Sequence, residues 1–203
     1  VPSGASTGIH EAIELRDKDD NRYNGKGVSK AISNILEIVY PKIINKNFNT
    51  IKEFDDLLIS IDGTKNKSNL GANATLALSL AFAKALANQK KEPLFKFLSN
   101  DSDYVLPVPM MNIINGGSHA DNNVDIQEFM IAPIGAPNFA ESLRYGSEIF
   151  YSLKSKLKSK GLNTNVGDEG GFAPNINSSN EVIELIIDSI NSTGLKTGDD
   201  VVI

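Results

Sequence analysis

The spacing of apolar residues predicts three helices in the first half of the chain. Apolar positions recur every three to four residues from 28 to 44, with Pro41 late in the pattern. Thr50 as an N-cap with Glu53 three residues later is a capping-box pattern, and it introduces a second amphipathic segment that an Asp-Gly pair ends. The third segment, 71–89, is rich in Ala and Leu with apolar residues on nearly every side, so we expect it to be largely buried.

The pattern changes between 100 and 103, where we place the boundary between two domains, 1–102 and 103–203. The elements expected after it are strands over 106–114 and 129–133, a helix over 139–160, a loop over 165–173 after a very short strand, a helix over 181–193 capped by Ser179 or Asn180, and a final strand at 201–203. This order is typical of an α/β barrel or an open α/β sheet, whose active sites lie beyond one end of the strands.

The connection between the first two of these strands predicts how they pair. If they pair directly, a loop of roughly ten residues fits a hairpin and is too short for a parallel crossover, so the strands should be antiparallel. Ser118, His119, Gln127 and Glu128 then converge at one rim. Because Gln127 and Glu128 are adjacent, they point to opposite faces unless the strand has not yet begun or carries a bulge.

Composition narrows the class of protein. The 203 residues are 40% hydrophobic and 22% charged, which is typical of a folded globular chain, and the net charge of −5 gives no pull toward nucleic acid or anionic membranes. The lysine run 154–160 is interpreted as a solvated helix face. The absence of cysteine excludes disulfides, thiolate catalysis and cysteine-ligated zinc. Since the sequence shows neither a signal-peptide pattern nor an 18-residue apolar span, a cytosolic setting is the default.

Three glycine-flanked polar segments are the candidate functional loops. The segment 115–128, with Gly-Gly-Ser-His and Gln-Glu, stands between two apolar runs where a purely structural connection needs only a turn. The segment 166–174 sets Asp168 and Glu169 among three glycines, so the backbone can approach a ligand while the acids transfer protons or bind a hard cation. The segment 3–8 offers hydroxyl and carbonyl oxygens for Mg²⁺ or amides for a phosphate.

Each loop also has a structural alternative. Glycine and serine are the usual turn residues, which is the ordinary interpretation of the segment 3–8 taken alone. A single histidine such as His119 is more often a hydrogen-bonded or surface residue than a catalytic one. The residues 121–123 can be turn residues, and adjacent acids are commonly solvated. For Asp168 and Glu169 the surrounding glycines favour function instead.

The three segments in this order, with Leu-Gly-Ala-Asn-Ala at 70–74, resemble the enolase (phosphopyruvate hydratase) family over the whole chain. The His-Ala-Asp-Asn-Asn form of the central loop resembles the bacterial branch of the family more than the animal branch. The resemblance implies the C-terminal part of an α+β capping domain over 1–102, followed over 103–203 by the first strands and helices of a ββαα(βα)₆ TIM-like barrel. Because the chain begins without methionine at Val1 and ends in β-branched residues, we expect a fragment.

The resemblance implies a hydro-lyase of glycolysis that interconverts 2-phospho-D-glycerate and phosphoenolpyruvate with two Mg²⁺ ions. In this family pattern Glu169 is the acid that protonates the leaving hydroxide, with Glu128 assisting. His119, Gln127 and Glu128 contact the substrate, and Ser6 ligates the second Mg²⁺. The remaining metal carboxylates and a lysine base are expected beyond the last residue, so the 203 residues alone should be inactive.

For partners, the resemblance implies a homodimer, with no nucleic acid and no membrane, in the cytoplasm and with a secondary cell-surface or secreted pool. Two other classes stay open. One is a non-catalytic relative used as a binding surface. The other is a nucleotide-phosphate module, but the sequence lacks the Gly-x-x-x-x-Gly-Lys-Ser/Thr pattern that such a module needs.

Overall fold

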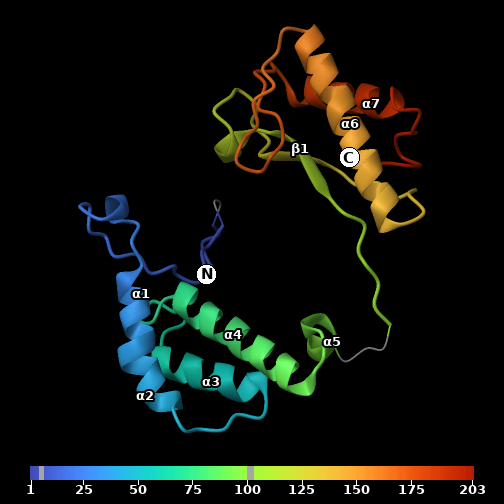
Figure 1. Ribbon diagram of the computed structural model, residues 1–203. Helices are drawn as coiled ribbons and strands as arrows, with labels where there is room; N and C mark the ends of the chain where they lie inside the picture. The colour runs from blue at the N-terminus through green and yellow to red at the C-terminus, as the bar shows by residue number, and fades with distance from the viewer. Residues whose placement is uncertain (5–6, 100–102) are drawn as a thin grey trace. The chain divides into compact units, whose positions relative to one another are not determined.

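The computed structural model describes residues 1–4, 7–99 and 103–203. The chain divides into two compact units, Val1–Asp103 and Tyr104–Ile203, and each is described by itself. Figure 1 shows a group of helices in the first unit, and a strand pair with two long helices in the second.

The first predicted helix is confirmed, with an irregular middle. It begins with α1 (Ser29–Ser33), continues through the π-helical η2 (Asn34–Val39) and ends with α2 (Tyr40–Ile43). Pro41 lacks an amide hydrogen, and its ring crowds the carbonyl four residues earlier, at Glu37. The wider π turn just before the proline relieves that conflict without ending the helix. A short 3₁₀ turn, η1 (Tyr23–Gly25), precedes this helix.

The second predicted helix, α3 (Ile51–Asp62), is also confirmed, including its caps. The Thr50 hydroxyl accepts a hydrogen bond from the Glu53 amide at 3.1 Å. The Glu53 carboxylate accepts from the Asn49 amide at 2.8 Å, one residue before the position that the capping-box pattern predicts. Gly63 ends the helix with a left-handed φ of 68°.

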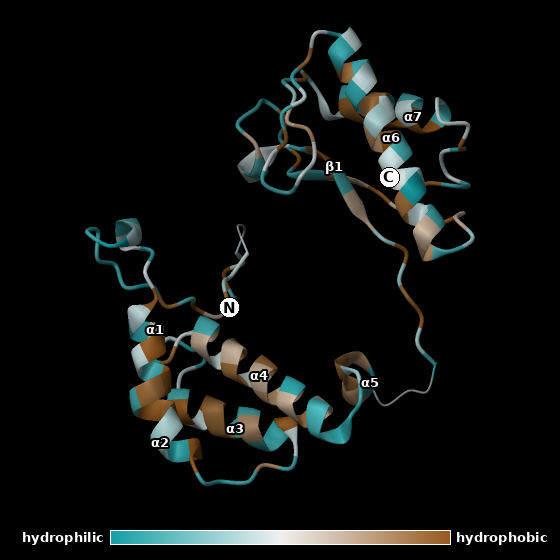
Figure 2. Cartoon of the chain, in the orientation of Figure 1, coloured by the Kyte–Doolittle hydropathy of each residue, from teal (hydrophilic) through white to brown (hydrophobic). Residues whose placement is uncertain are grey.

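The third predicted helix, α4 (Ala72–Lys90), forms as expected, but the prediction that it is largely buried is wrong. Leu76 is 47% exposed and Leu80 is 40% exposed. Figure 2 shows apolar colours along most of α4. Helices α1, α3 and α5 (Leu94–Leu98) contact α4 from the same unit, and the described residues leave the side with Leu76 and Leu80 uncovered.

Asp62, at the end of α3, is 1% exposed and links the helix to the following loop. Its carboxylate accepts from the Leu70 amide at 2.7 Å and from the Thr64 amide at 3.0 Å. Burial alone raises the pKa of Asp62, but the hydrogen bonds from Leu70 and Thr64 outweigh it and hold the pKa below its usual value. The ionised carboxylate therefore stabilises the folded state.

Asp62→Asn should lower the free energy of unfolding by about 1–3 kcal/mol at neutral pH, because one buried amide loses its acceptor. The folded-state pKa lies below the unfolded value of about 3.9, so the contribution is complete above that pH and is lost as the pH falls through the folded-state pKa. Urea unfolding at several pH values measures the difference. The control is Asp56→Asn on the same helix, whose exposed carboxylate pairs with Lys52 at 2.6 Å. Equal effects of the two substitutions at neutral pH would contradict the assignment.

The second unit contains a two-stranded antiparallel sheet, as predicted from the loop length. It pairs β1 (Met111–Asn115) with β2 (Glu128–Ile131). Asn115 lies opposite Glu128, and the register is irregular between 112 and 114. The bulge allowed for in the sequence therefore lies in β1 rather than next to Gln127.

The ends of the predicted strands differ from the structure. The run 106–110 was predicted to belong to the first strand, but it stays outside the sheet that the described residues form, and Leu106 and Met110 are each 72% exposed. Apolar residues alone do not make a strand without a partner for their backbone groups. The final segment pairs only through isolated bridges, one of them between Ala132 and Val202.

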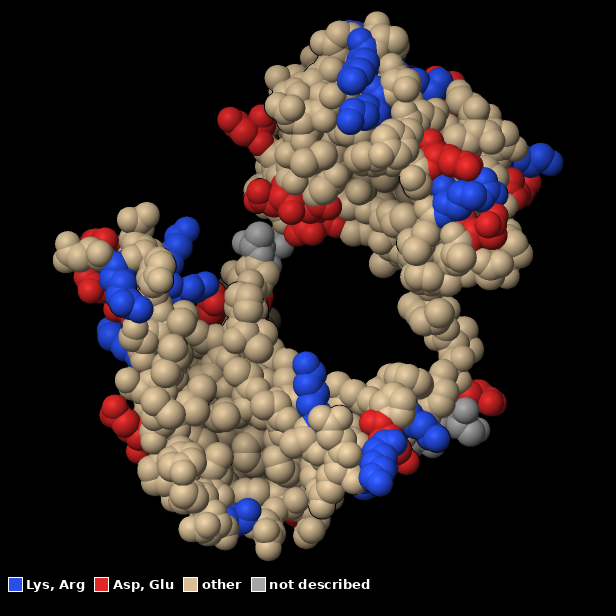
Figure 3. All heavy atoms as spheres, in the orientation of Figure 1, with Lys and Arg blue, Asp and Glu red and all other residues tan. Residues whose placement is uncertain are grey.

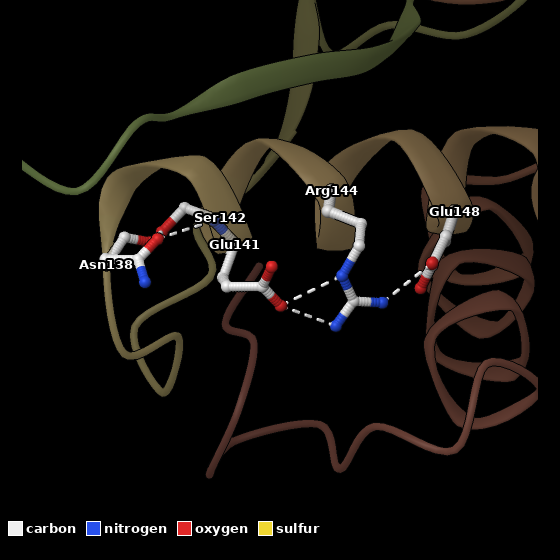
Figure 4. Close-up of polar contacts among 5 residues, drawn as sticks. All are labelled: Asn138, Glu141, Ser142, Arg144 and Glu148. Carbon is white, nitrogen blue, oxygen red and sulfur yellow. Dashed lines mark hydrogen bonds and ion pairs between the residues drawn. The ribbon is translucent and has the colours of Figure 1, made fainter.

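The predicted helix over 139–160 is confirmed as α6 (Phe139–Ser159). Figure 4 shows its first turns, where the Asn138 side chain accepts from the Glu141 amide at 2.9 Å. On the exposed face Arg144 pairs with Glu141 and Glu148, each at 2.7 Å. The hydrogen bonds that Arg144 donates to Glu141 and then to Glu148 raise its pKa, so it is protonated at any working pH.

The last predicted helix is α7 (Ser179–Asn191). The predicted caps, Ser179 and Asn180, are wrong. Ser178 is the cap, and its hydroxyl accepts from the Glu181 amide at 3.2 Å. The acid at the third helical position marks the correct cap three residues before it, as in the other capping patterns of this chain.

One hydrophobic core fills the second unit between the sheet and the two helices. Phe172 stacks on Phe150 with ring centroids 4.2 Å apart and an interplanar angle of 15°. The other buried side chains of this core include Ile113, Ile114, Phe129, Ile131, Ile149, Leu153, Leu157, Val182, Ile186, Ile190 and Val201.

The distribution of charge on the surface and the length of the helices are as the composition predicts. Figure 3 shows Lys and Arg interspersed with Asp and Glu over the visible face of each unit. In the part of the chain that the structure describes, no helix combines the length and the apolar character needed to cross a membrane.

Candidate active site

The loop 166–172 carries the adjacent acids and is fastened to the end of β1. Its own ends are closed by the Gly167 amide, which donates to the Gly171 carbonyl at 2.8 Å. The Asn115 amide of β1 donates to the Phe172 carbonyl, also at 2.8 Å. The loop therefore lies against the strand end, with Glu169 at its tip.

The loop between the strands is held shut by its glycines. The Gly116 amide donates to the Gln127 carbonyl at 2.9 Å, and the Gly117 amide donates to the Val124 carbonyl at 2.7 Å. The 3₁₀ turn η3 (Gly117–His119) follows directly and ends at His119. These backbone hydrogen bonds thus fix the position from which the His119 side chain extends.

Asn122 has a structural role in this loop. Its side-chain oxygen accepts from the Val124 amide at 3.2 Å, and its side-chain nitrogen donates to the Asn115 carbonyl at 2.9 Å. Of the alternatives for 121–123, the turn interpretation therefore fits Asn122.

Three of the predicted site residues meet around the His119 ring. His119 is 3% exposed, and its Nε2 lies 2.8 Å from the Gln127 side-chain nitrogen. Its Nδ1 lies 3.3 Å from Glu128 Oε1 and 3.9 Å from Glu169 Oε1. Ser118 donates to the Gln127 side-chain oxygen at 3.3 Å. Gln127 and Glu128 therefore both contact the imidazole, one at each nitrogen.

The hydrogen bonds favour one tautomer of the His119 ring. The Gln127 oxygen accepts from Ser118, so its amide nitrogen is the group that donates to His119 Nε2. In the neutral ring the proton then lies on Nδ1. That nitrogen is buried, and it faces the two carboxylates at ion-pair distance without the geometry of a hydrogen bond.

Ser6, the predicted metal ligand, lies outside the described residues. The expectation that Ser6 ligates a Mg²⁺ ion at the same site as His119 and Glu169 stays a prediction.

The same three side chains are the candidate cation ligands among the described residues. His119, Glu128 and Glu169 offer ligand atoms that all lie within 4.8 Å of one another. Mg²⁺ takes oxygen ligands in near-octahedral geometry, and an imidazole nitrogen is a poor donor for it. These three residues alone do not fit Mg²⁺, so we assign no step to the ion through them.

A buried imidazole whose Nδ1 faces two carboxylates, beside the strand ends of an α/β unit, is an arrangement that can take part in proton transfer. Residues 1–98 match the family model of the N-terminal domain of enolase, and residues 103–203 match that of the enolase C-terminal TIM barrel domain. The chain belongs to the enolase family. The predicted fold class, an enolase-like capping domain followed by barrel strands and helices, is thereby confirmed.

Gly116→Ala should lower the free energy of unfolding by about 1–3 kcal/mol, because the added methyl group overpacks the loop. A Cβ there would lie 2.5 Å from the carbonyl oxygens of Val124 and Ile126, neither of which is a flexible side chain. Urea unfolding measures the loss. The control is Gly8→Ala, where a Cβ meets nothing within 4 Å. A Gly116 variant as stable as this control would show that the loop opens freely.

Proposed function

We propose that the protein carrying this chain is a hydro-lyase that reversibly dehydrates 2-phospho-D-glycerate to phosphoenolpyruvate. The observation that carries the proposal is the convergence of Glu128 and Glu169 on the buried ring of His119. Membership of the enolase family supports the same reaction. The small-molecule substrate follows from the family, and its identity is the proposal.

The reaction requires an acid. The C2–H and C3–O bonds break, a C2=C3 double bond forms, and the oxygen leaves as water only if it gains a proton. Hydroxide is a poor leaving group, so a carboxylic acid beside it lowers the barrier. The Glu169 side chain is 46% exposed and that of Glu128 is 24% exposed, so Glu169 is the carboxyl group more accessible to substrate.

Glu128 and His119 act on the substrate from the inner side of the same site. Glu128 lies closer to Nδ1 than Glu169 does, so it orients the ring and assists the acid. We assign the Nδ1–H of His119, which has no hydrogen-bond partner among the described residues, to an anionic oxygen of the bound substrate. Gln127 holds the ring through Nε2, and it completes the substrate contacts that this proposal assigns.

Enolases generally bind Mg²⁺, which neutralises negative charge that builds up on the substrate carboxylate when it is bound. Ser6 is the proposed ligand within this chain. We assign no described side chain as a further metal ligand. We also assign none as the base that removes the C2 proton. A homodimer and a cytoplasmic location are likewise proposed from the family pattern.

The test is a steady-state assay of the protein that carries this chain, with 2-phospho-D-glycerate and Mg²⁺, following phosphoenolpyruvate formation. Turnover in both directions is expected, with none on 3-phospho-D-glycerate, which lacks a leaving hydroxyl at C3. A purified, folded protein that forms no phosphoenolpyruvate from 2-phospho-D-glycerate, and binds neither of these two compounds, would contradict the proposal. Calorimetric binding of ATP would favour the nucleotide-phosphate alternative.

A further inference from the structure

Asn115 connects the segments that carry His119, Glu128 and Glu169. It lies opposite Glu128 in the strand pair. Its amide donates to Phe172 in the Glu169 loop at 2.8 Å, and its carbonyl accepts from Asn122 in the His119 loop at 2.9 Å. One residue at the end of β1 thus touches the three segments that carry His119, Glu128 and Glu169.

The Asn115 side chain also lies beneath the Glu169 loop. Asn115 is 0% exposed. A Cβ at Gly167 would overlap the Asn115 side-chain nitrogen, and one at Gly171 would lie 2.8 Å from its side-chain oxygen. The two glycines at the base of the loop therefore leave space that this amide fills.

The hydrogen bonds of this amide are incomplete. Its oxygen accepts from the Asn112 side chain, while its nitrogen is buried and has no hydrogen-bond partner among the residues that the structure describes. A buried unpaired N–H costs about 1–3 kcal/mol, so stability alone is a poor reason for an asparagine at this position.

We propose that Asn115 is a positioning residue: its buried side chain, packed between Gly167 and Gly171, holds the Glu169 loop at a fixed place relative to Glu128 and His119. The role rests on the proposed function, because the geometry it maintains is that of the proposed acid. A misplacement of about 1 Å in such a group can cost roughly 10²-fold in rate.

The experiment compares Asn115→Ala with the wild type in the intact protein by two readouts. Hydrogen exchange measures the protection of the Gly167 and Phe172 amides, which should exchange at least about tenfold faster in the variant because the loop loses its support. Kinetics with 2-phospho-D-glycerate should show kcat lowered by about 10–10²-fold and KM changed much less. Asn115→Ser, which keeps a hydroxyl toward Asn112, is the second variant, and it replaces the first if Asn115→Ala does not fold.

The matched control is Asn73→Ala, which removes another buried asparagine. Asn73 is 7% exposed and pairs with both backbone groups of Leu15, at 3.1 and 3.0 Å, in the first unit. It should lower stability without changing exchange in the loop 166–172. Wild-type exchange rates in a folded Asn115 variant would overturn the positioning role. A wild type that turns over no 2-phospho-D-glycerate contradicts the proposed function instead, and the exchange readout still decides whether Asn115 holds the loop.

Discussion

Replacing Glu169 with Gln should lower kcat for dehydration of 2-phospho-D-glycerate by about 10²–10⁴-fold, because an amide cannot donate the proton that the leaving hydroxide needs. KM should change far less, since Gln keeps the shape of the side chain and the loop stays attached to β1. The hydration of phosphoenolpyruvate should fall by the same factor, because the C3–O bond breaks and forms through the same transition state in the two directions. Steady-state kinetics in both directions measures these effects.

Asp168→Asn is the matched control for this prediction. Asp168 is the neighbouring acid on the same loop, and its amide donates to the His119 carbonyl at 3.3 Å. This backbone contact remains in the variant, and the side chain has no assigned step, so we expect a change in kcat of less than about tenfold, or about 1.4 kcal/mol. A larger loss in Asp168→Asn than in Glu169→Gln would reassign the acid.

Phe172→Ala should lower the free energy of unfolding by about 3–5 kcal/mol, the usual cost of removing a fully buried aromatic ring. Phe172 is 1% exposed, and its ring stacks on Phe150 at 4.2 Å. Its backbone joins the Glu169 loop to β1 through bonds of 2.8 and 2.9 Å to Asn115 and Ile113. Urea unfolding followed by circular dichroism measures the loss.

Tyr151→Ala is the control for Phe172→Ala. Tyr151 is 64% exposed, and its ring lies edge-on to Phe150 with centroids 6.1 Å apart. Removing this exposed ring should change the free energy of unfolding by less than about 0.5 kcal/mol, apart from a small loss of the contact with Phe150. If the two substitutions cost the same, the core of the second unit does not depend on Phe172 as described.

The parts of the fold that were predicted correctly depend on neighbours in the sequence. The capping residues of α3 and the periodicity of α6 are local features, and the antiparallel pairing follows from the length of one loop. The exposure of Leu76 and the absence of 106–110 from the sheet are different, because they depend on which other segments supply cover or backbone partners. The sequence carries no local signal for the exposure of Leu76, whereas Pro107 and Pro109, which have no amide hydrogen to donate to a sheet, were a local signal against a strand over 106–110.

The candidate site was predictable to the extent that its motifs concentrate unusual residues. Glycines beside His119 and Glu169 showed which loops approach something closely, and the structure brings both side chains to one place. Asn115 was missed as a functional residue, although it opens the central motif. Its one sequence signal is a polar residue ending an apolar run, and the packing against Gly167 and Gly171 that supports the proposed role is visible only in the structure.

The most direct test of the central claim, that Glu169 acts on the leaving hydroxide, is exchange of the C2 hydrogen of 2-phospho-D-glycerate in D₂O, followed by nuclear magnetic resonance. Removal of this hydrogen does not need the acid. In Glu169→Gln we therefore expect C2 exchange to continue near the wild-type rate while phosphoenolpyruvate formation falls by about 10²–10⁴-fold. Loss of exchange and elimination in the same proportion would contradict the account, because Glu169 would then be needed before the C3–O bond breaks.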